Sequence, residues 1–269
     1  MKMHKWSSYS LTSENIGIYE EIFENVKIID THAHIGKDED GHSMSADKLI
    51  KYMDTANINK SIVFPLNDNN HSVNFNESND AILLAAKVYQ DRFIPFFRLD
   101  PNKSWKEEFN LRLGQGFKGI KLHPRSQNFK LTSSKVMGIY EEAEKNNIAI
   151  LVHTGFGLEE VAEELVEITK KFSNLKIIIG HAGFVDLDNV IKKLGKKENI
   201  IFDTSTLKIF DLFDLLKKVD YQKIAFGSDI PYYDIDLALE GLIDSAITVG
   251  KTAYQIKKIL GGNIAKWFQ

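Results

Sequence analysis

The chain has 269 residues, 43% hydrophobic and 26% charged, with a formal net charge of −3. This composition is typical of a globular protein with a large core, and it gives no field that would favour nucleic acid or an anionic membrane. The lack of cysteine excludes disulfides, thiolate metal ligands and a cysteine nucleophile. No apolar run approaches the roughly 20 residues of a membrane span, and residues 1–10 show no signal-peptide core, so a cytoplasmic location is expected.

Apolar periodicity predicts strands and helices that alternate along the chain. A short amphipathic helix is expected within residues 11–25, before a strand over residues 26–32 that ends at a His-x-His pair. Further strands are predicted at 60–65, 93–98, 116–124, 148–153, 175–180, 199–203 and 223–227. Helices are predicted from Ser45 as the N-cap residue and over 77–89, 104–113, 131–147, 158–172, 187–194, 207–219, 236–249 and 252–260, with a break at residues 261–263.

The pattern of these elements predicts the fold. The strands are short, apolar and rich in Ile and Val, as in a parallel sheet that is buried on both faces. Eight strands that alternate with helices predict an α/β protein with a (β/α)8 TIM barrel. An open doubly wound sheet usually has a glycine-rich first turn, whereas the first turn here carries His-x-His. We expect one domain over residues 1–269, with 1–25 as a helical extension and the barrel over about 26–269.

The candidate site residues lie at strand ends. His32 and His34 are two positions apart, so both imidazoles point to the same side of the first strand, which suits a divalent metal. In a TIM barrel the carboxyl ends of all strands meet at one rim, where active sites form. We therefore expect the other strand-end residues to converge there. They are Arg98, Lys121, His123, His153, His181 and Asp229.

The motifs IIDTHAHIG, GIKLHP, ILVHTG, IIIGHAG and IAFGSDIP, with the ending ILGGNIAKWF, carry a family resemblance. From about Val26 to its end the chain resembles the amidohydrolase superfamily, in particular the amidohydrolase-2 branch related to aminocarboxymuconate semialdehyde decarboxylase. The resemblance implies one metal, usually Zn, with Mn or another divalent ion as alternatives. It also implies the ligands, which are His32, His34, His153 and Asp229. Asp229 would also accept a proton from the water, and His181 would act on the metal-bound water or substrate.

Two inward-facing residues extend this site. Asp30 lies two positions before His32, so its side chain points to the same side of the strand. We expect it either to hydrogen-bond to a metal-binding imidazole and support it, or to join a polar network in the barrel floor. Lys121 offers an alternative in which a carboxylated lysine bridges two metals. One metal is favoured because His123, rather than Lys121, lies at the very end of the fourth strand.

The remaining candidates concern substrate binding. His123 is expected to contact substrate, or else to hold the turn before Pro124. Arg98 and Arg125 could each pair with a substrate carboxylate in bidentate fashion, and surface salt bridges are the alternative. Three aromatic residues after the metal-bearing strands would line an apolar pocket wall or simply pack. They are Phe156, Phe184 and Tyr232. The long polar loop 67–78 is expected to affect specificity.

The leading hypothesis is a metal-dependent hydrolase in which activated water attacks an amide, ester or lactone of a small organic acid. The alternative on the same scaffold is a non-oxidative, metal-dependent decarboxylase, and fold alone does not choose between them. A third hypothesis is a metal-binding barrel that senses or stores a ligand without turnover. The expected partner is a carboxylate-bearing small molecule rather than nucleic acid or membrane, and the resemblance suggests a homodimer.

Overall fold

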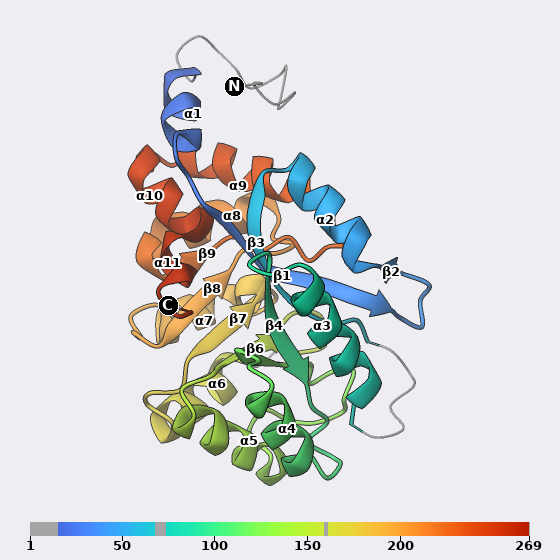
Figure 1. The fold of residues 1–269 in the computed structure, drawn as a ribbon. Helices are drawn as coiled ribbons and strands as arrows, with labels where there is room; N and C mark the ends of the chain where they lie inside the picture. The colour runs from blue at the N-terminus through green and yellow to red at the C-terminus, as the bar shows by residue number, and fades with distance from the viewer. Residues whose placement is uncertain (1–15, 68–73, 159–160, 269) are drawn as a thin grey trace.

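The computed structural model describes residues 16–67, 74–158 and 161–268, in which strands form a central sheet with helices around it (Figure 1). Within these residues one sheet of nine strands has the order β2-β1-β3-β4-β5-β6-β7-β8-β9. The strands are β1 (Ile28–Lys37), β2 (Ser43–Met44), β3 (Ile58–Pro65), β4 (Phe93–Arg98), β5 (Gly119–Leu122), β6 (Ala149–His153), β7 (Ile177–Gly180), β8 (Ile200–Asp203) and β9 (Ile224–Ala225).

Backbone hydrogen bonds close the sheet into a barrel. Strands β1 and β3 to β9 pair in parallel, each with the next. The chain that leaves β9 then returns to β1, where the Thr31 N–H donates to the Phe226 carbonyl at 2.8 Å and the Asp229 N–H donates to the His32 carbonyl at 2.7 Å. The predicted TIM barrel is therefore confirmed, and its last turn lies directly beside the His-x-His pair.

The helices largely follow the sequence pattern. The α-helices are α1 (Ile16–Phe23), α2 (Ala46–Thr55), α3 (Asn76–Val88), α4 (Lys106–Gly114), α5 (Ser134–Lys145), α6 (Val161–Lys171), α7 (Leu187–Leu194), α8 (Ile209–Lys218), α9 (Ile235–Thr248), α10 (Ala253–Lys257) and α11 (Asn263–Ala265). The short helices are η1 (His181–Gly183), η2 (Tyr221–Lys223) and the π-helix η3 (Lys258–Gly262). Ser45 caps α2 as predicted, because its side chain accepts the Lys48 N–H at 3.1 Å. None of these helices is both long and apolar enough to cross a membrane.

The first strand differs from its prediction. β1 does not end at the His-x-His pair but runs on to Lys37, where it forms an antiparallel hairpin with β2. The Asp38 N–H donates to the His42 carbonyl at 3.0 Å across this hairpin, so the backbone of the extension is paired. His32 and His34 therefore lie inside a long strand, which holds their side chains more firmly than a strand end would.

The expected break at residues 261–263 was also wrong. The chain stays helical there, first as η3 and then as α11. A Cβ on Gly261 would collide with the Lys27 carbonyl oxygen and approach the Ile29 N–H to 3.1 Å. Gly261 thus serves close packing of a helix against the start of β1 rather than chain termination.

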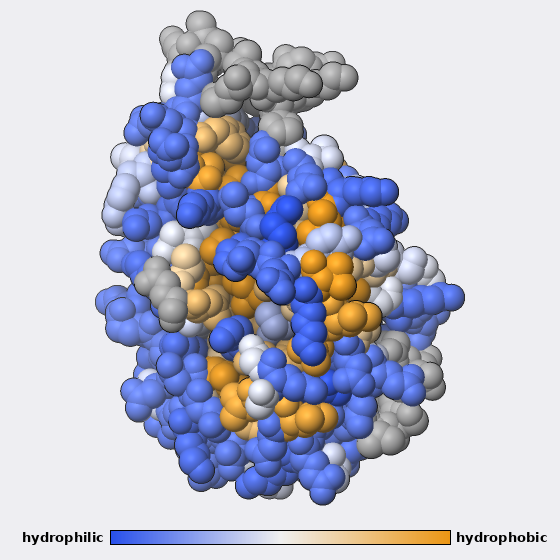
Figure 2. Space-filling view, in the orientation of Figure 1, coloured by the Kyte–Doolittle hydropathy of each residue, from blue (hydrophilic) through white to orange (hydrophobic). Residues whose placement is uncertain are grey.

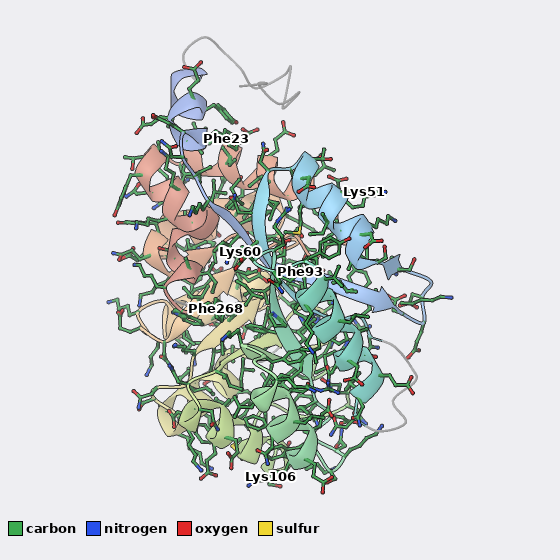
Figure 3. All side chains as sticks on the ribbon, in the orientation of Figure 1. Phe23, Lys51, Lys60, Phe93, Lys106 and Phe268 are labelled. Atoms are coloured by element: carbon green, nitrogen blue, oxygen red, sulfur yellow. The ribbon has the colours of Figure 1, made fainter. Side chains whose placement is uncertain are left out.

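Apolar residues form two layers. The larger cluster lies between strands and helices, and the smaller one comes from side chains inside the barrel, among them Ile29, Phe64 and Phe96. Trp267 and Phe268 pack against the smaller cluster, and the ring of Phe268 (labelled in Figure 3) meets that of Phe96 edge-on at 5.8 Å. Figure 2 shows apolar side chains gathered in the middle of this face, between hydrophilic surfaces. The barrel interior is therefore packed, which leaves its rim for chemistry.

Candidate metal centre and active site

Three buried side chains converge where the barrel closes. His32 and His34 come from β1, and Asp229 follows β9. The Asp229 Oδ1 atom lies 3.2 Å from His32 Nε2 and 3.0 Å from His34 Nε2. Each of the three side chains offers one atom that could bind a metal, and these three atoms all lie within 4.8 Å of one another. Among the described residues, His32, His34 and Asp229 form the group that meets this criterion. The structure thus brings together three of the four predicted metal ligands.

A carboxylate fixes the orientation of His32. Asp203 ends β8, and its Oδ2 atom lies 2.5 Å from His32 Nδ1. A carboxylate accepts the Nδ1–H, so the lone pair on Nε2 is left facing Asp229 and a potential metal. Sequence reasoning missed Asp203, although it ends a predicted strand as the chosen candidates do.

Of its two expected roles, Asp30 takes the second, as part of a polar network. Its carboxylate accepts the backbone N–H groups of His32 and Ser228, both at 2.9 Å, and the Ser228 hydroxyl at 2.7 Å. Burial raises the pKa of Asp30 to about 7. Asp30 therefore ties the backbone of β1 to the turn that carries Asp229, and the support of the His32 ring comes from Asp203.

The donor set fits a divalent metal. Burial lowers the pKa values of His32 and His34 well below the ordinary value, so both imidazoles are neutral, as metal ligation requires. Two imidazoles and one carboxylate can bind a divalent metal, and a second carboxylate behind one of the rings is typical of such sites. Burial raises the pKa of the Asp229 carboxyl to about 6.

His153, the fourth predicted ligand, lies outside the group of three. Its Nδ1 atom is 3.1 Å from His181 Nε2, and its ring stacks on His123 with centroids 3.7 Å apart. The His181 ring is in turn 4.9 Å from the ring of His32. The ends of β5, β6 and β7 therefore present a row of imidazoles that leads to the metal ligands.

Lys121 lies deep in the site. Its Nζ atom is 2.9 Å from His32 Nε2 and 4.5 Å from the centre of the Phe64 ring. Burial lowers the pKa of Lys121 to about 7. The lysine thus reaches the metal ligands as a bridging role would require, and that role stays a prediction.

The two arginines predicted to bind substrate have different environments. Arg98 is buried at the end of β4, where Nη2 donates to Asn67 Oδ1 at 3.1 Å. Arg125 is exposed, and its Nη1 donates to the Phe156 carbonyl at 3.4 Å. Arg98 therefore belongs to the interior of the site, and Arg125 belongs to its rim.

His123 lies between the interior and the rim. Its Nδ1 atom accepts the Ser126 N–H at 3.3 Å, and its backbone N–H donates to Gln127 Oε1 at 2.7 Å. These bonds match the expected alternative of a histidine that holds the turn. They also leave the proton of a neutral ring on Nε2, where it can be donated to a ligand.

One of the three predicted aromatic residues touches the candidate ligands. The Tyr232 ring lies 5.3 Å from that of His34, and its hydroxyl donates to Asp38 Oδ2 at 2.6 Å. Phe156 and Phe184 pack edge-on against each other at 5.1 Å, and Phe156 is exposed. Tyr232 thus forms a wall beside His34, while the phenylalanine pair forms part of the surface near the rim.

Three residues of the site have left-handed backbone, namely His181, Thr206 and Asp229, with φ of 57°, 55° and 67°. This conformation is unfavourable for residues with a Cβ, most of all for a β-branched one such as threonine. Strained backbone of this kind tends to cluster at functional sites, where the surrounding structure holds it in place. In this barrel it occurs in the turns that follow β7, β8 and β9, which carry residues of the site.

The model of the amidohydrolase family Amidohydro_2 matches residues 29–269. The chain belongs to the amidohydrolase family. It is accordingly an enzyme of the hydrolase or carboxy-lyase type, and the resemblance read from its motifs is confirmed. No curated protein matches the sequence of this amidohydrolase significantly.

Solved structures share the fold of this amidohydrolase. A probable 2-pyrone-4,6-dicarboxylic acid hydrolase from Acinetobacter baumannii, with citric acid bound, is 18% identical, and the alignment covers 90% of this chain and 99% of that one with a TM-score of 0.64. An uncharacterised TIM-barrel protein from Bordetella bronchiseptica is 15% identical over 90% and 98% of the chains, with a TM-score of 0.73. A 2,6-dihydroxybenzoate decarboxylase complexed with 2,6-dihydroxybenzoate is 16% identical over 91% and 98%, with a TM-score of 0.69.

Proposed function

We propose that this amidohydrolase is a metal-dependent hydrolase that cleaves an amide, ester or lactone of a small organic acid. The observation that carries the proposal is the convergence of His32, His34 and Asp229, whose donor atoms lie within 4.8 Å of one another. These residues would hold one divalent metal, with Zn favoured by the nitrogen and oxygen donors and Mn as an alternative. His153 stays the predicted fourth ligand.

When bound, the metal would lower the pKa of water and polarise the carbonyl group that is attacked. Asp229 would accept the proton of the attacking water, since its Oδ1 lies at the donor set. His181 has its Nε2 atom in the row of imidazoles and would act as a second proton-handling group. Burial of the histidines limits competing water around the reacting atoms.

The substrate is proposed to carry a carboxylate. Arg98 supplies a buried guanidinium, and His123 Nε2 supplies a hydrogen-bond donor in the same region. Arg125 would act at the rim. Two of the related structures hold citric acid and 2,6-dihydroxybenzoate, both carboxylates, which supports this choice of substrate class. A homodimer and a cytoplasmic location stay predictions from the sequence.

A non-oxidative decarboxylase is the second candidate. It is favoured by the similarity to the fold of the 2,6-dihydroxybenzoate decarboxylase, with a TM-score of 0.69. In that reaction the bond to the carboxylate breaks, its electron pair stays on the substrate carbon, and this carbon takes a proton as carbon dioxide leaves. Such a site needs a proton donor, whereas hydrolysis first needs a proton acceptor.

A product assay tests the proposed function. The Zn-loaded protein would be screened against lactones, esters and amides of small dicarboxylic acids, and against hydroxybenzoates, with acid release followed by pH-stat and carbon dioxide measured in parallel. The hydrolase proposal predicts acid release without carbon dioxide, and loss of that activity in His34→Ala. Carbon dioxide release that depends on His34 would overturn it in favour of the decarboxylase.

A further inference from the structure

The side-chain amide of Asn79 binds the backbone of Arg98 at two points. Arg98 ends β4, and the hydrogen-bonded ladder between β3 and β4 ends earlier, at Val63 and Pro95. Asn79 lies near the start of α3, where its Oδ1 accepts the Arg98 N–H at 2.9 Å and its Nδ2 donates to the Arg98 carbonyl at 3.0 Å. A side chain from a helix therefore takes the place of a neighbouring strand at the end of β4.

A buried ion pair holds Asn79 in this orientation. Asn79 Nδ2 also donates to Glu108 Oε1 at 2.8 Å, and the same oxygen accepts the Nε–H of Arg112 at 2.5 Å. Arg112 reaches from α4 back to α3, where its Nη2 donates to the Asn76 carbonyl at 2.9 Å. The side chains of Asn79, Glu108 and Arg112 are all buried. Both hydrogens and the oxygen of the Asn79 amide are thus engaged, which gives the amide one orientation.

This network fixes positions more than it stabilises the fold. A charge that is buried costs free energy unless it is paired and hydrogen-bonded. Well-packed apolar residues of similar volume often give equal or greater stability than a buried ion pair. The pair of Glu108 and Arg112 instead joins α3, α4 and, through Asn79, the end of β4. Its distinctive effect is to set the backbone of Arg98 relative to two helices.

The guanidinium of Arg98 is held by the residues around the same helix start. The Phe75 ring, directly before α3, lies 4.8 Å from Arg98 Cζ, and Arg98 Nη1 donates to the Pro65 carbonyl at 3.4 Å. Arg98 is paired with Lys121 in the β4–β5 ladder, so both side chains lie on one face of the sheet, and Lys121 reaches His32. Two-point binding of a carboxylate needs a guanidinium plane in a fixed place.

We propose that Asn79 is a positioning residue for substrate binding. It fixes the backbone of Arg98, and through this backbone the guanidinium that would take the substrate carboxylate. Glu108 and Arg112 hold the Asn79 amide for this task. The effect on substrate binding rests on the proposed function, whereas the positioning of Arg98 does not. A displacement of about 1 Å at such a group can cost about 100-fold in rate, so a contact behind Arg98 matters for function.

NMR of the full-length protein labelled with 15N-arginine tests the positioning without a substrate. The chain has four arginines, Arg92, Arg98, Arg112 and Arg125, and loss of signals in Arg98→Lys assigns those of Arg98. In the wild type the Arg98 backbone N–H should exchange slowly with solvent, and its Nε–H should have a high order parameter. In Asn79→Leu the exchange should be faster and the order parameter lower. Unchanged values in folded Asn79→Leu would overturn the proposal.

Substitutions of the same shape keep the test decisive if the leucine variant does not fold. Asn79→Asp keeps an acceptor for the Arg98 N–H but turns an oxygen towards the Arg98 carbonyl and Glu108, so it should loosen Arg98 in both measurements. Adding Glu108→Gln supplies an N–H for the introduced carboxylate and should restore part of the order. Asn110→Asp, at an exposed position of α4, is the control and should match the wild type. A double variant no more ordered than Asn79→Asp would overturn the role of Glu108.

A double-mutant cycle tests the consequence for binding. The probe is 2,6-dihydroxybenzoate, the carboxylate held by one of the related structures, and its Kd for the metal-reconstituted protein is measured by calorimetry. Asn79→Leu should raise this Kd about 10-fold at unchanged metal content, and should have no further effect in Arg98→Gln. Full additivity of the two substitutions would overturn the route through Arg98. A wild type that has an ordered Arg98 but does not bind the carboxylate would instead count against the proposed substrate class alone.

Discussion

At the scale of single residues, hydrogen-bond partners decide what each imidazole can do. His32 faces the donor set through Nε2 because Asp203 accepts its Nδ1–H at 2.5 Å. The carboxylate behind a metal-binding histidine fixes the ring and raises its basicity. A site described only by its metal ligands would therefore omit Asp203, on which the geometry of His32 depends.

Replacing this carboxylate should weaken metal binding. In Asp203→Asn an amide NH2 can face His32 Nδ1, which opposes the tautomer that ligation needs. We expect a loss of about 10- to 100-fold in metal affinity, measured by competition with a chelator. Asp214→Asn is the control, since Asp214 is exposed and pairs with Lys218 on the same helix. Equal affinities of Asp203→Asn and the wild type would contradict this role.

Replacing His181, the second proton-handling group of the proposed reaction, should separate catalysis from metal binding. In His181→Asn we expect kcat to fall by about 10²- to 10⁴-fold, the usual contribution of general acid–base catalysis. Metal content should stay at the wild-type level because His181 lies outside the group of three ligands. Turnover and elemental analysis of the same preparation check both parts. Loss of the metal would instead make His181 a ligand.

Strand parity predicted some of these residues and missed others for a physical reason. Alternation along β1 placed His32 and His34 on one side, and strand ends predicted Asp229 and His181. The alternation of side chains along a strand does not show which carboxylate hydrogen-bonds to an imidazole. That pairing depends on side-chain rotamers and on the turn after β8. For Asp30 parity left two roles open, and its hydrogen bonds to the backbone N–H groups of His32 and Ser228 match the polar network rather than the support of an imidazole.

At the scale of elements, the close approach of the η3 backbone to β1 limits which residues can replace Gly261. A Cβ on Gly261 would meet the Lys27 carbonyl, so Gly261→Ala must push η3 away from β1. We expect a loss of about 1–3 kcal/mol in the free energy of unfolding, measured with urea. Gly241 in α9 has nothing within 4 Å of a built Cβ, so Gly241→Ala should instead add about 0.5–1 kcal/mol. Similar effects of both substitutions would refute the packing role.

The buried strands and helices were predictable because their apolar periodicity is strong. The β2 strand has two residues and pairs through backbone atoms, so it leaves no pattern to detect. The π-helix η3 was mistaken for a break because its two glycines are also typical of turns. In both cases the deciding interaction is with β1, which is distant in sequence from η3 and set by tertiary packing.

At the scale of the whole molecule, the donor set spans the closure of the barrel. His32 and His34 belong to β1, and Asp229 belongs to the segment that hydrogen-bonds back to it. A metal held by all three would join the first and last strands, so it should stabilise the folded state. At a free metal concentration 100 times Kd the gain is about 2.7 kcal/mol, or about 5–10 °C in Tm.

Thermal unfolding with and without chelator checks this stabilisation. The Tm should fall when the metal is removed and recover on adding Zn²⁺. His42→Ala is a suitable control variant, because His42 contacts Asp38 and Tyr232 outside the group of three and should keep the full shift. Identical Tm values for metal-loaded and metal-free protein would mean that the metal does not bind across the closure.

Elemental analysis of purified, Zn-reconstituted protein tests the metal centre most directly, with His34→Ala and His42→Ala measured beside the wild type. The metal centre predicts about one equivalent of divalent metal in the wild type and in His42→Ala, and a loss of that metal in folded His34→Ala. No metal in the reconstituted wild type, or full retention in His34→Ala, would contradict a metal held by His32, His34 and Asp229.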